Sequence, residues 1–228
     1  MKSFNFRDRN DLSPPKTPTP TNARSETSSA GRRLASPPLQ NSIADDIVAL
    51  VVDAAKPQPE DKAIDLACGP GTVACALAKR VRHVVGLDST VPMLEQARGF
   101  ARRQSLDNVE WRAGDVYQTP FADGSFDIVT CRFAFHHFEK PALAFAEMVR
   151  LVATGGRVVV CDGLASEEPA KAEAFNAMER RRDPSTVEFR TLTYLRRLFE
   201  AAGLGEAKVA AVRRFLSRVR PCRALVSG

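Results

Sequence analysis

The stretch that decides the fold is AIDLACGPGTVACALA, residues 63–78. An apolar run that carries Asp65 breaks at Gly-Pro-Gly and then resumes as an Ala- and Leu-rich pattern with a helical period. The two glycines, Gly69 and Gly71, can adopt positive φ angles and leave no Cβ between the backbone and a ligand. The stretch therefore predicts a strand, a tight turn and a helix, with the turn as a candidate ligand seat.

Strand and helix patterns alternate along the rest of the chain. Apolar runs predict strands at residues 63–67, 83–88, 109–115, 126–133 and 156–163. Helical periods predict helices at residues 41–56, 72–80, 91–104, 141–152, 169–182 and 191–203. Gly155 and Gly156 predict a turn, and two weak strands near 206–212 and 223–227 end the chain. This alternation is typical of an α/β fold with a parallel sheet and helices on both faces.

The two ends of the chain differ in composition from its middle. Residues 1–40 are rich in Pro, Ser, Thr and Arg, which predicts a disordered tail ahead of one domain over residues 41–228. Residues 1–40 carry a net charge of +4 and residues 206–228 carry +5, whereas the middle of the chain carries −3, so the positive net charge of +6 comes from the two ends. Basic ends can attract nucleic acid, but no aromatic residues interleave with the N-terminal charges, so we interpret them as solvated surface and nucleic acid as an unlikely partner.

No segment predicts a membrane span, a secretion signal or a metal site. No apolar run approaches the roughly 18 residues that a bilayer requires, and the N-terminus lacks an apolar signal core. The five cysteines show no C-x-x-C spacing, and no histidine motif typical of a metal centre accompanies them. Their odd number and apolar neighbours indicate reduced thiols, so we expect a cytoplasmic protein.

Asp88 ends the second predicted strand and is the next candidate ligand-binding residue. Ligands of parallel α/β sheets bind at the carboxyl ends of the strands. A carboxylate there can accept two hydrogen bonds from a ribose diol, although Asp88 can equally cap the helix that follows. Gly69, Gly71 and Ala74 also fit the G-x-G-x-x-A spacing of a dinucleotide site. A dehydrogenase is nevertheless disfavoured, because Asp65 would repel a pyrophosphate and no Tyr-x-x-x-Lys pair is present.

Asp65 suits a ligand with a positive group. S-adenosylmethionine carries an ammonium and a sulfonium and no phosphate, and an aspartate beside the glycine turn can help to hold its ammonium. Four segments in order now resemble motifs of the class I S-adenosylmethionine-dependent methyltransferases. They are DLACGPGTVACALA, VVGLDSTVPMLEQAR, VEWRAGDVYQTPFADGSFDIVTCRFAFHHF and ALAFAEMVRLVATGGRVVVCDG. The likeness covers about residues 60–205 and is greatest to the ubiquinone/menaquinone C-methyltransferase type.

The resemblance implies a fold and a set of cofactor contacts. The fold is a Rossmann-like, doubly wound, mostly parallel seven-stranded sheet with an antiparallel last strand. The cofactor S-adenosyl-L-methionine would meet residues from four strand ends. Those residues are Asp65, Gly69 and Gly71 at the methionine end, Asp88 at the ribose, Ser89, Met93, Asp115 and Val116 at the adenine, and Cys131 and Arg132 near the sulfonium. Taken singly, Met93 is more typical of a core residue, and Asp115 is also a plausible turn residue; the acids at three successive strand ends favour the cofactor roles.

His136 and His137 are the candidate catalytic residues. They follow the fourth predicted strand in FAFHHF, and a ring nitrogen there could take a proton from the methyl acceptor. The alternative is structural, with one histidine capping the next helix and the other packing under Phe135 and Phe138. The neighbouring phenylalanines favour an apolar or aromatic small-molecule acceptor.

Three functions remain open from the residues and the resemblance. The favoured one is a small-molecule methyltransferase. The others are a nucleic-acid or protein methyltransferase that uses the basic ends, and a non-catalytic cofactor-binding relative. The segment over residues 179–203 resembles the helical lid of the family. The family's longer segment before the last strand is reduced to about ten residues. This predicts a more open cleft, a homodimer whose second copy covers the cleft, or impaired activity.

Overall fold

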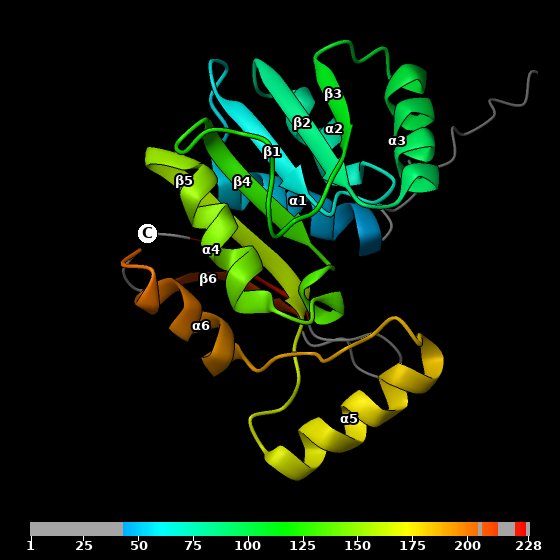
Figure 1. The fold of residues 1–228 in the computed structure, drawn as a ribbon, viewed down its shortest axis with the longest axis vertical. Helices are drawn as coiled ribbons and strands as arrows, with labels where there is room; N and C mark the ends of the chain where they lie inside the picture. Colours follow the sequence, from blue (N-terminus) through cyan, green and yellow to red (C-terminus); the bar gives the residue numbers. More distant parts are fainter. Residues whose placement is uncertain (1–42, 205–206, 214–221, 227–228) are drawn as a thin grey trace, which may run out of the picture. The chain divides into compact units, whose positions relative to one another are not determined.

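Seven strands form the sheet of the computed structural model, which describes residues 43–204, 207–213 and 222–226 (Figure 1). The strands are β1 (Lys62–Leu66), β2 (His83–Asp88), β3 (Val109–Ala113), β4 (Phe126–Arg132), β5 (Val152–Gly163), β6 (Lys208–Arg213) and β7 (Cys222–Val226). Their order is β3-β2-β1-β4-β5-β7-β6. β1 to β5 pair in parallel, whereas β7 is antiparallel to both β5 and β6. The predicted mostly parallel sheet with an antiparallel last strand is therefore confirmed.

Six α-helices and one short 3₁₀ helix connect the described strands. They are α1 (Ile43–Ala55), α2 (Thr72–Ala78), α3 (Val91–Arg103), the 3₁₀ helix η1 (Phe135–His137), α4 (Pro141–Leu151), α5 (Pro169–Arg182) and α6 (Leu192–Ala201). Proline stands in the first turn of α3, α4 and α5, where its missing N–H leaves no helical hydrogen bond unmade. The predicted helices are thus present, and η1 is an additional element within FAFHHF.

Each face of the sheet carries its own hydrophobic core. On one face, Val51 of α1 and Leu77 of α2 pack against strand residues such as Ile128. On the other face, Phe145 of α4 and Phe199 of α6 pack against residues such as Ile64. Burying apolar side chains on both faces explains why the strands are continuous apolar runs rather than alternating ones.

Gly155 and Gly156 do not form the turn that was predicted ahead of the fifth strand. β5 begins at Val152, directly after α4, and runs through both glycines. Gly155 adopts φ 79°, and the pairing of β4 with β5 shifts in register between Phe126 and Ile128. A residue at positive φ is typical of a bulge, which bends a strand without ending it. The predicted turn is therefore an irregularity within β5, where its pairing with β4 shifts in register.

The chain order reverses between β1 and β4, which lie side by side in the sheet. In sheets of this kind the crevice at the reversal, outside the carboxyl ends of the strands, receives the ligand. The glycine turn follows β1 and η1 follows β4, so both candidate segments meet at this crevice. Among the described helices, none combines the length and apolar character that crossing a membrane would require. The tail predicted over residues 1–40 lies outside the described residues.

Candidate functional site

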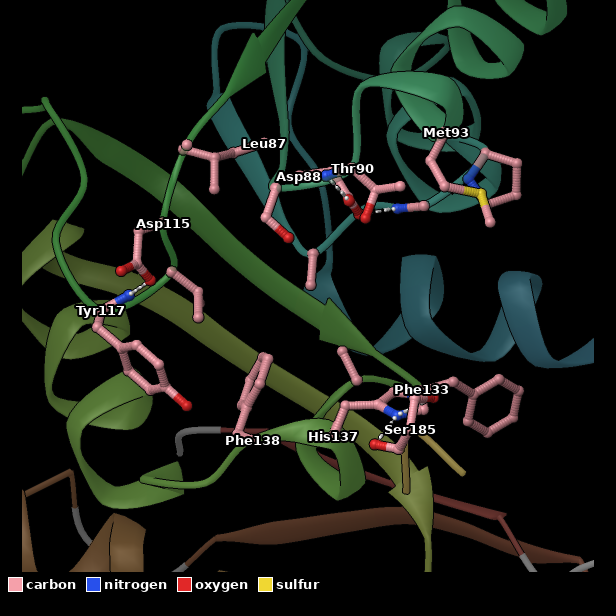
Figure 2. Close-up of a pocket in the computed structure, with 17 residues that line it drawn as sticks. Leu87, Asp88, Thr90, Met93, Asp115, Tyr117, Phe133, His137, Phe138 and Ser185 are labelled. Carbon is pink, nitrogen blue, oxygen red and sulfur yellow. Dashed lines mark hydrogen bonds between the residues drawn. The ribbon is translucent and has the colours of Figure 1, made fainter. Parts of the chain in front are cut away.

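A cavity of about 650 Å³ opens at the carboxyl ends of β1, β2, β3 and β4 (Figure 2). This size falls within the usual range for small-molecule and cofactor sites. Seven of the residues predicted from the sequence line it, namely Gly69, Asp88, Ser89, Met93, Asp115, Val116 and His137. Figure 2 shows Asp88, Thr90 and Met93 at one end and Phe138, His137 and Ser185 at the other. We call these the cofactor end and the acceptor end, after the roles that the resemblance predicts for them.

Asp88 is the buried carboxylate of the cofactor end. Its Oδ2 accepts a hydrogen bond from the Gly69 amide at 2.7 Å, and its Oδ1 accepts one from the Thr90 amide at 2.8 Å. The first bond ties the glycine turn to β2. The second closes a turn ahead of α3, whose N-cap is Thr90 with no side-chain cap bond, so the predicted capping role of Asp88 is wrong. A carboxylate offers about four acceptor positions, so two remain for a ligand's hydroxyl groups.

The two glycines of the turn differ in what occupies the space where a Cβ would stand. Gly69 has φ 51°, lines the cavity, and has open space where a Cβ would stand. Gly71 has φ 78° and does not line the cavity. A Cβ on Gly71 would lie 2.4 Å from the Trp111 ring and 2.9 Å from the Ala97 Cβ. Gly69 therefore leaves room for a ligand, whereas Gly71 leaves room for the side chains of β3 and α3.

Apolar groups and one exposed carboxylate complete the cofactor end. Met93, 38% exposed on α3, and Leu87 of β2 present apolar side chains to the cavity. Asp115 follows β3, and its Oδ1 accepts a hydrogen bond from the Tyr117 amide at 2.9 Å. That bond is the turn role foreseen for Asp115, and the carboxylate stays exposed at the cavity.

Asp65, Gly71, Cys131, Arg132 and His136 are the predicted site residues that do not line this cavity. Asp65 is buried under the turn, where it accepts a hydrogen bond from Thr130 Oγ1 at 2.7 Å. Burial raises the pKa of the Asp65 carboxyl to about 7. Cys131 is buried in the core, and Arg132 lines a separate cavity beside α1. Their contacts with a cofactor stay predictions.

His137 lies at the acceptor end, and its Nδ1 contacts two oxygens of Ser185. One is the Ser185 Oγ at 3.1 Å, which donates its hydrogen to Asp183 Oδ1 and so can only accept from the ring. The other is the backbone carbonyl oxygen of Ser185, 3.0 Å from Nδ1, in the segment after α5. A carbonyl oxygen only accepts, so Nδ1 carries the proton and donates it. In the neutral ring the lone pair available for a base then resides on Nε2.

His136 lies inside the molecule beside Asp162 of β5. The His136 side chain is buried, and its Nδ1 is 2.8 Å from Asp162 Oδ1. One ring face stacks on Phe189 with centroids 4.2 Å apart and planes 10° apart. The His137 ring lies 4.0 Å from the His136 ring. The structural alternative is therefore correct only in that one histidine is packed in the interior: His136 packs on Phe189 and Asp162, and α4 has Lys140 as its N-cap with no side-chain cap bond, so neither histidine caps it.

The acceptor end combines the phenylalanines that the sequence singled out with Tyr117, Ala134 and Ser185, which it did not. Tyr117 and Phe138 meet edge to face with centroids 6.0 Å apart, and Phe133 and Ala134 follow β4. Phe133 adopts φ 54°, as Ala67 does at φ 51° after β1. Aromatic residues after strand four were a visible signal for this wall. Ser185 had no such signal, because 48 residues separate it from His137.

The residues present fit an adenosyl ligand at the cofactor end. Asp88 has free acceptor capacity beside a glycine whose missing Cβ leaves open space. Leu87 and Met93 line the cavity beside that carboxylate, and among the described residues that line the cavity there is no Lys or Arg. This donor set suits hydroxyl groups and a flat ring, and it offers no cation for a pyrophosphate.

Comparison with known protein families identifies the chain. A family of proteins described as a methyltransferase domain matches residues 64–160. The uncharacterized methyltransferase YcgJ of Bacillus subtilis (strain 168) is 36% identical over 152 residues, 67% of this chain and 60% of that protein. A demethylmenaquinone methyltransferase of Clavibacter sepedonicus is 33% identical over 135 residues, 59% of this chain and 54% of that protein. The chain thus spans about half to three-fifths of the length of these relatives.

Solved structures give the same result. The crystal structure of YcgJ from Bacillus subtilis has a TM-score of 0.72 at 25% identity, covering 78% of this chain and 95% of that one. A proposed methyltransferase of Bacillus halodurans C-125 has a TM-score of 0.69 at 33% identity, covering 75% of this chain and 72% of that one. Fold, cavity position and sequence agree: the chain belongs to the class I S-adenosylmethionine-dependent methyltransferases.

Proposed function

We propose that the chain transfers a methyl group from S-adenosyl-L-methionine to an apolar small-molecule acceptor that carries one exchangeable proton. The observation that supports this most is the single cavity whose two ends differ in chemistry. One end presents Asp88 beside an unobstructed glycine, and the other presents aromatic rings and one histidine. A cofactor and an acceptor bound end to end would need this division.

The cofactor supplies an electrophilic methyl group on a sulfonium, so the protein's work is alignment. Asp88 would hold the ribose hydroxyls, with Gly69 giving the backbone a close approach. Met93 would cover the adenine, with Ser89, Asp115 and Val116 beside it. Asp65 would act on the methionine end from beneath the turn, through its hold on Thr130 of β4. Cys131 and Arg132 do not line this cavity, so we assign them no direct contact with the methyl group.

His137 would act as the general base for the acceptor. Its Nδ1 faces the Ser185 carbonyl oxygen at 3.0 Å, which leaves Nε2 to take a proton. A hydroxyl or an activated ring carbon that loses this proton becomes the nucleophile. His136 has its Nδ1 against Asp162 and does not line the cavity, so we assign it no direct proton transfer.

The lining of the acceptor end restricts the acceptor's charge. Among the described residues that line the cavity, Asp88 and Asp115 are the acids, both outside the acceptor end, and none is Lys or Arg. A phosphorylated acceptor would therefore meet no counter-charge, while an aromatic one would pack on Tyr117, Phe133 and Phe138. This favours a phenol-like or otherwise planar apolar molecule.

The same proposal covers location, domain extent and assembly. Residues 41–228 would form the catalytic domain, with residues 1–40 as a tail without a catalytic role. Cys68, Cys75 and Cys131 are free and buried, which fits a reducing, cytoplasmic location. A second copy would cover the cleft in a homodimer. Sedimentation of the purified chain tests the homodimer, and a single species of monomer mass would exclude it.

Two measurements test the proposed function. In calorimetry, S-adenosylmethionine should bind and NAD should not; binding of NAD alone would return the dehydrogenase alternative. Incubating cell-extract metabolites with an isotope-labelled methyl donor should then label an apolar small molecule. Label confined to RNA or protein would exclude the small-molecule acceptor, and cofactor binding with no label in any fraction would indicate a non-catalytic relative.

A further inference from the structure

Asp162 is a buried carboxylate at the end of β5 that does not line the cavity. Only 2% of the residue is exposed. Its Oδ2 accepts a hydrogen bond from the His136 amide at 2.9 Å, and its Oδ1 accepts one from the Gly163 amide at 2.7 Å. Oδ1 is also 2.8 Å from His136 Nδ1. Three donors satisfy the carboxylate, and two of them belong to one histidine, so Asp162 fixes both the backbone and the ring of His136.

His136 passes this constraint to the segment after α5. Its backbone carbonyl oxygen accepts hydrogen bonds from the amides of Val187 at 2.8 Å and Glu188 at 3.1 Å. Its ring stacks on Phe189 of the same segment. Asn176 of α5 holds Phe189 from the other side, with its Oδ1 accepting from the Phe189 amide at 2.7 Å. The segment is therefore seated on His136.

Gly163 gives Phe189 the space to occupy this position. A Cβ on Gly163 would lie 2.7 Å from Cε1 and 2.9 Å from Cδ1 of the Phe189 ring. Consecutive residues at the end of β5 thus serve one purpose, since Asp162 holds His136 and Gly163 admits the ring stacked on it.

The seated segment delivers the carbonyl that orients the proposed base. Ser185 precedes Val187 by two residues, and its carbonyl oxygen accepts from His137 Nδ1 at 3.0 Å. Ser185 is itself held by Asp183, whose Oδ1 accepts from the Ser185 amide at 3.0 Å and from Ser185 Oγ at 2.6 Å. The contacts form a continuous path from Asp162 through His136 and the segment to the ring of His137.

We propose that Asp162 is a positioning residue that holds His137 in its Nδ1–H form by seating the segment over residues 185–189 on His136. This inference rests on the proposed function, in which Nε2 of His137 takes the acceptor's proton. His136 is then the link between the carboxylate and the base. A loose segment would withdraw the Ser185 carbonyl oxygen and let the proton move to Nε2, where it blocks the base.

The test is nuclear magnetic resonance of protein labelled with ¹⁵N-histidine, compared between wild type and Asp162→Asn. The substitution keeps the shape but presents an amide N–H₂ where an oxygen accepted a hydrogen bond. The chain has three histidines, so each ring can be assigned. We expect His137 to show the Nδ1–H pattern in the wild type and a mixture with Nε2–H in the variant. Hydrogen exchange at the Val187 and Glu188 amides should speed up about tenfold.

Glu147→Gln is the matched control. Glu147 of α4 is 8% exposed, and its Oε1 accepts a hydrogen bond from the Thr119 amide at 2.8 Å. This contact is not part of the path from Asp162 to His137. The substitution should lower thermal stability and speed exchange at Thr119 while leaving His137 and the Val187 amide unchanged. A His137 shift in this control as large as that in Asp162→Asn would reduce the effect to general destabilisation and overturn the proposal.

Gly163→Ala tests the same path if Asp162→Asn does not fold. Its Cβ displaces Phe189 without touching the carboxylate, and the same mixture at His137 is expected. An unchanged His137 pattern in whichever of the two variants folds overturns the proposal. Titration of the wild type with S-adenosylmethionine separates the two ideas. Absence of binding there defeats the proposed function, whereas the ring pattern in the variants reports on Asp162 independently of turnover.

Discussion

The two ends of the cavity are built in different ways. The cofactor end comes from three consecutive strand ends, within residues 67–116, and its key contact joins Gly69 to Asp88, 19 residues apart. The acceptor end joins η1 to a segment 48 residues away, through His137 and Ser185. The cofactor end is therefore built from residues that are close in sequence, whereas the acceptor end depends on contacts between distant parts of the chain. A substitution at one end should therefore leave the other end intact.

The largest expected effect separates the two ends at the level of turnover. In His137→Ala the methylation rate should fall by roughly 100- to 10,000-fold, the usual contribution of a positioned base. The affinity for S-adenosylmethionine should stay the same, because His137 belongs to the acceptor end. Calorimetry and labelled-methyl assays measure both. His83→Ala, at a histidine that is 40% exposed in β2, is the control. An equal loss of cofactor affinity in His137→Ala would break the comparison.

The two glycines give the next largest effect, within the cofactor end itself. Gly71→Ala should lower the free energy of unfolding by about 3 kcal/mol, because its Cβ overlaps Trp111 and Ala97 at a positive φ. Gly69→Ala should lower it by only about 1 kcal/mol, because open space receives the Cβ. Its larger effect should be on cofactor binding. Urea unfolding and calorimetry on both variants measure the contrast, and equal stability losses would contradict it.

The buried carboxyl of Asp65, beneath the glycine turn, should make the free energy of unfolding depend on pH. Its pKa is raised to about 7 by burial, so the folded chain retains a proton that the unfolded chain releases near 3.8. The folded state binds more protons over this range, and the free energy of unfolding therefore falls as pH rises from about 4 to about 7. The loss should be about 3 kcal/mol. Denaturant titrations at several pH values should show this slope in the wild type and lose it in Asp65→Asn; a persistent slope would assign it elsewhere.

Asp88→Ala tests the other half of the comparison, the cofactor end, through ligand affinity. Loss of charged hydrogen bonds should weaken S-adenosylmethionine binding by about 1–3 kcal/mol. Turnover at saturating cofactor should change far less than in His137→Ala, because the acceptor end is intact. Asp107→Ala, at an exposed aspartate after α3, is the control. Unchanged affinity in Asp88→Ala would exclude the ribose role.

The differences between prediction and structure have physical reasons. Asp88 and Met93 were predictable because strand ends and helix starts recur at a spacing that the alternation of elements makes visible. The sequence did not predict which face of β1 carries Asp65, because both faces of β1 are buried and the residues on either side of Asp65 are apolar. Gly155 resembles a turn residue in sequence, and only the pairing of β4 with β5 distinguishes a bulge from a turn. The Asp162–His136 pair depends on tertiary contacts that no local pattern encodes.

Trp111 gives the molecule a built-in optical reporter. It is the one tryptophan of the chain, and its ring lies against the positions where Gly71 and Gly86 lack a Cβ. Intrinsic emission excited at tryptophan wavelengths therefore arises from a single ring wedged behind the glycine turn. Any compound that shifts this turn alters the surroundings of that fluorophore, so ligand screening requires no added dye and no knowledge of the methyl acceptor.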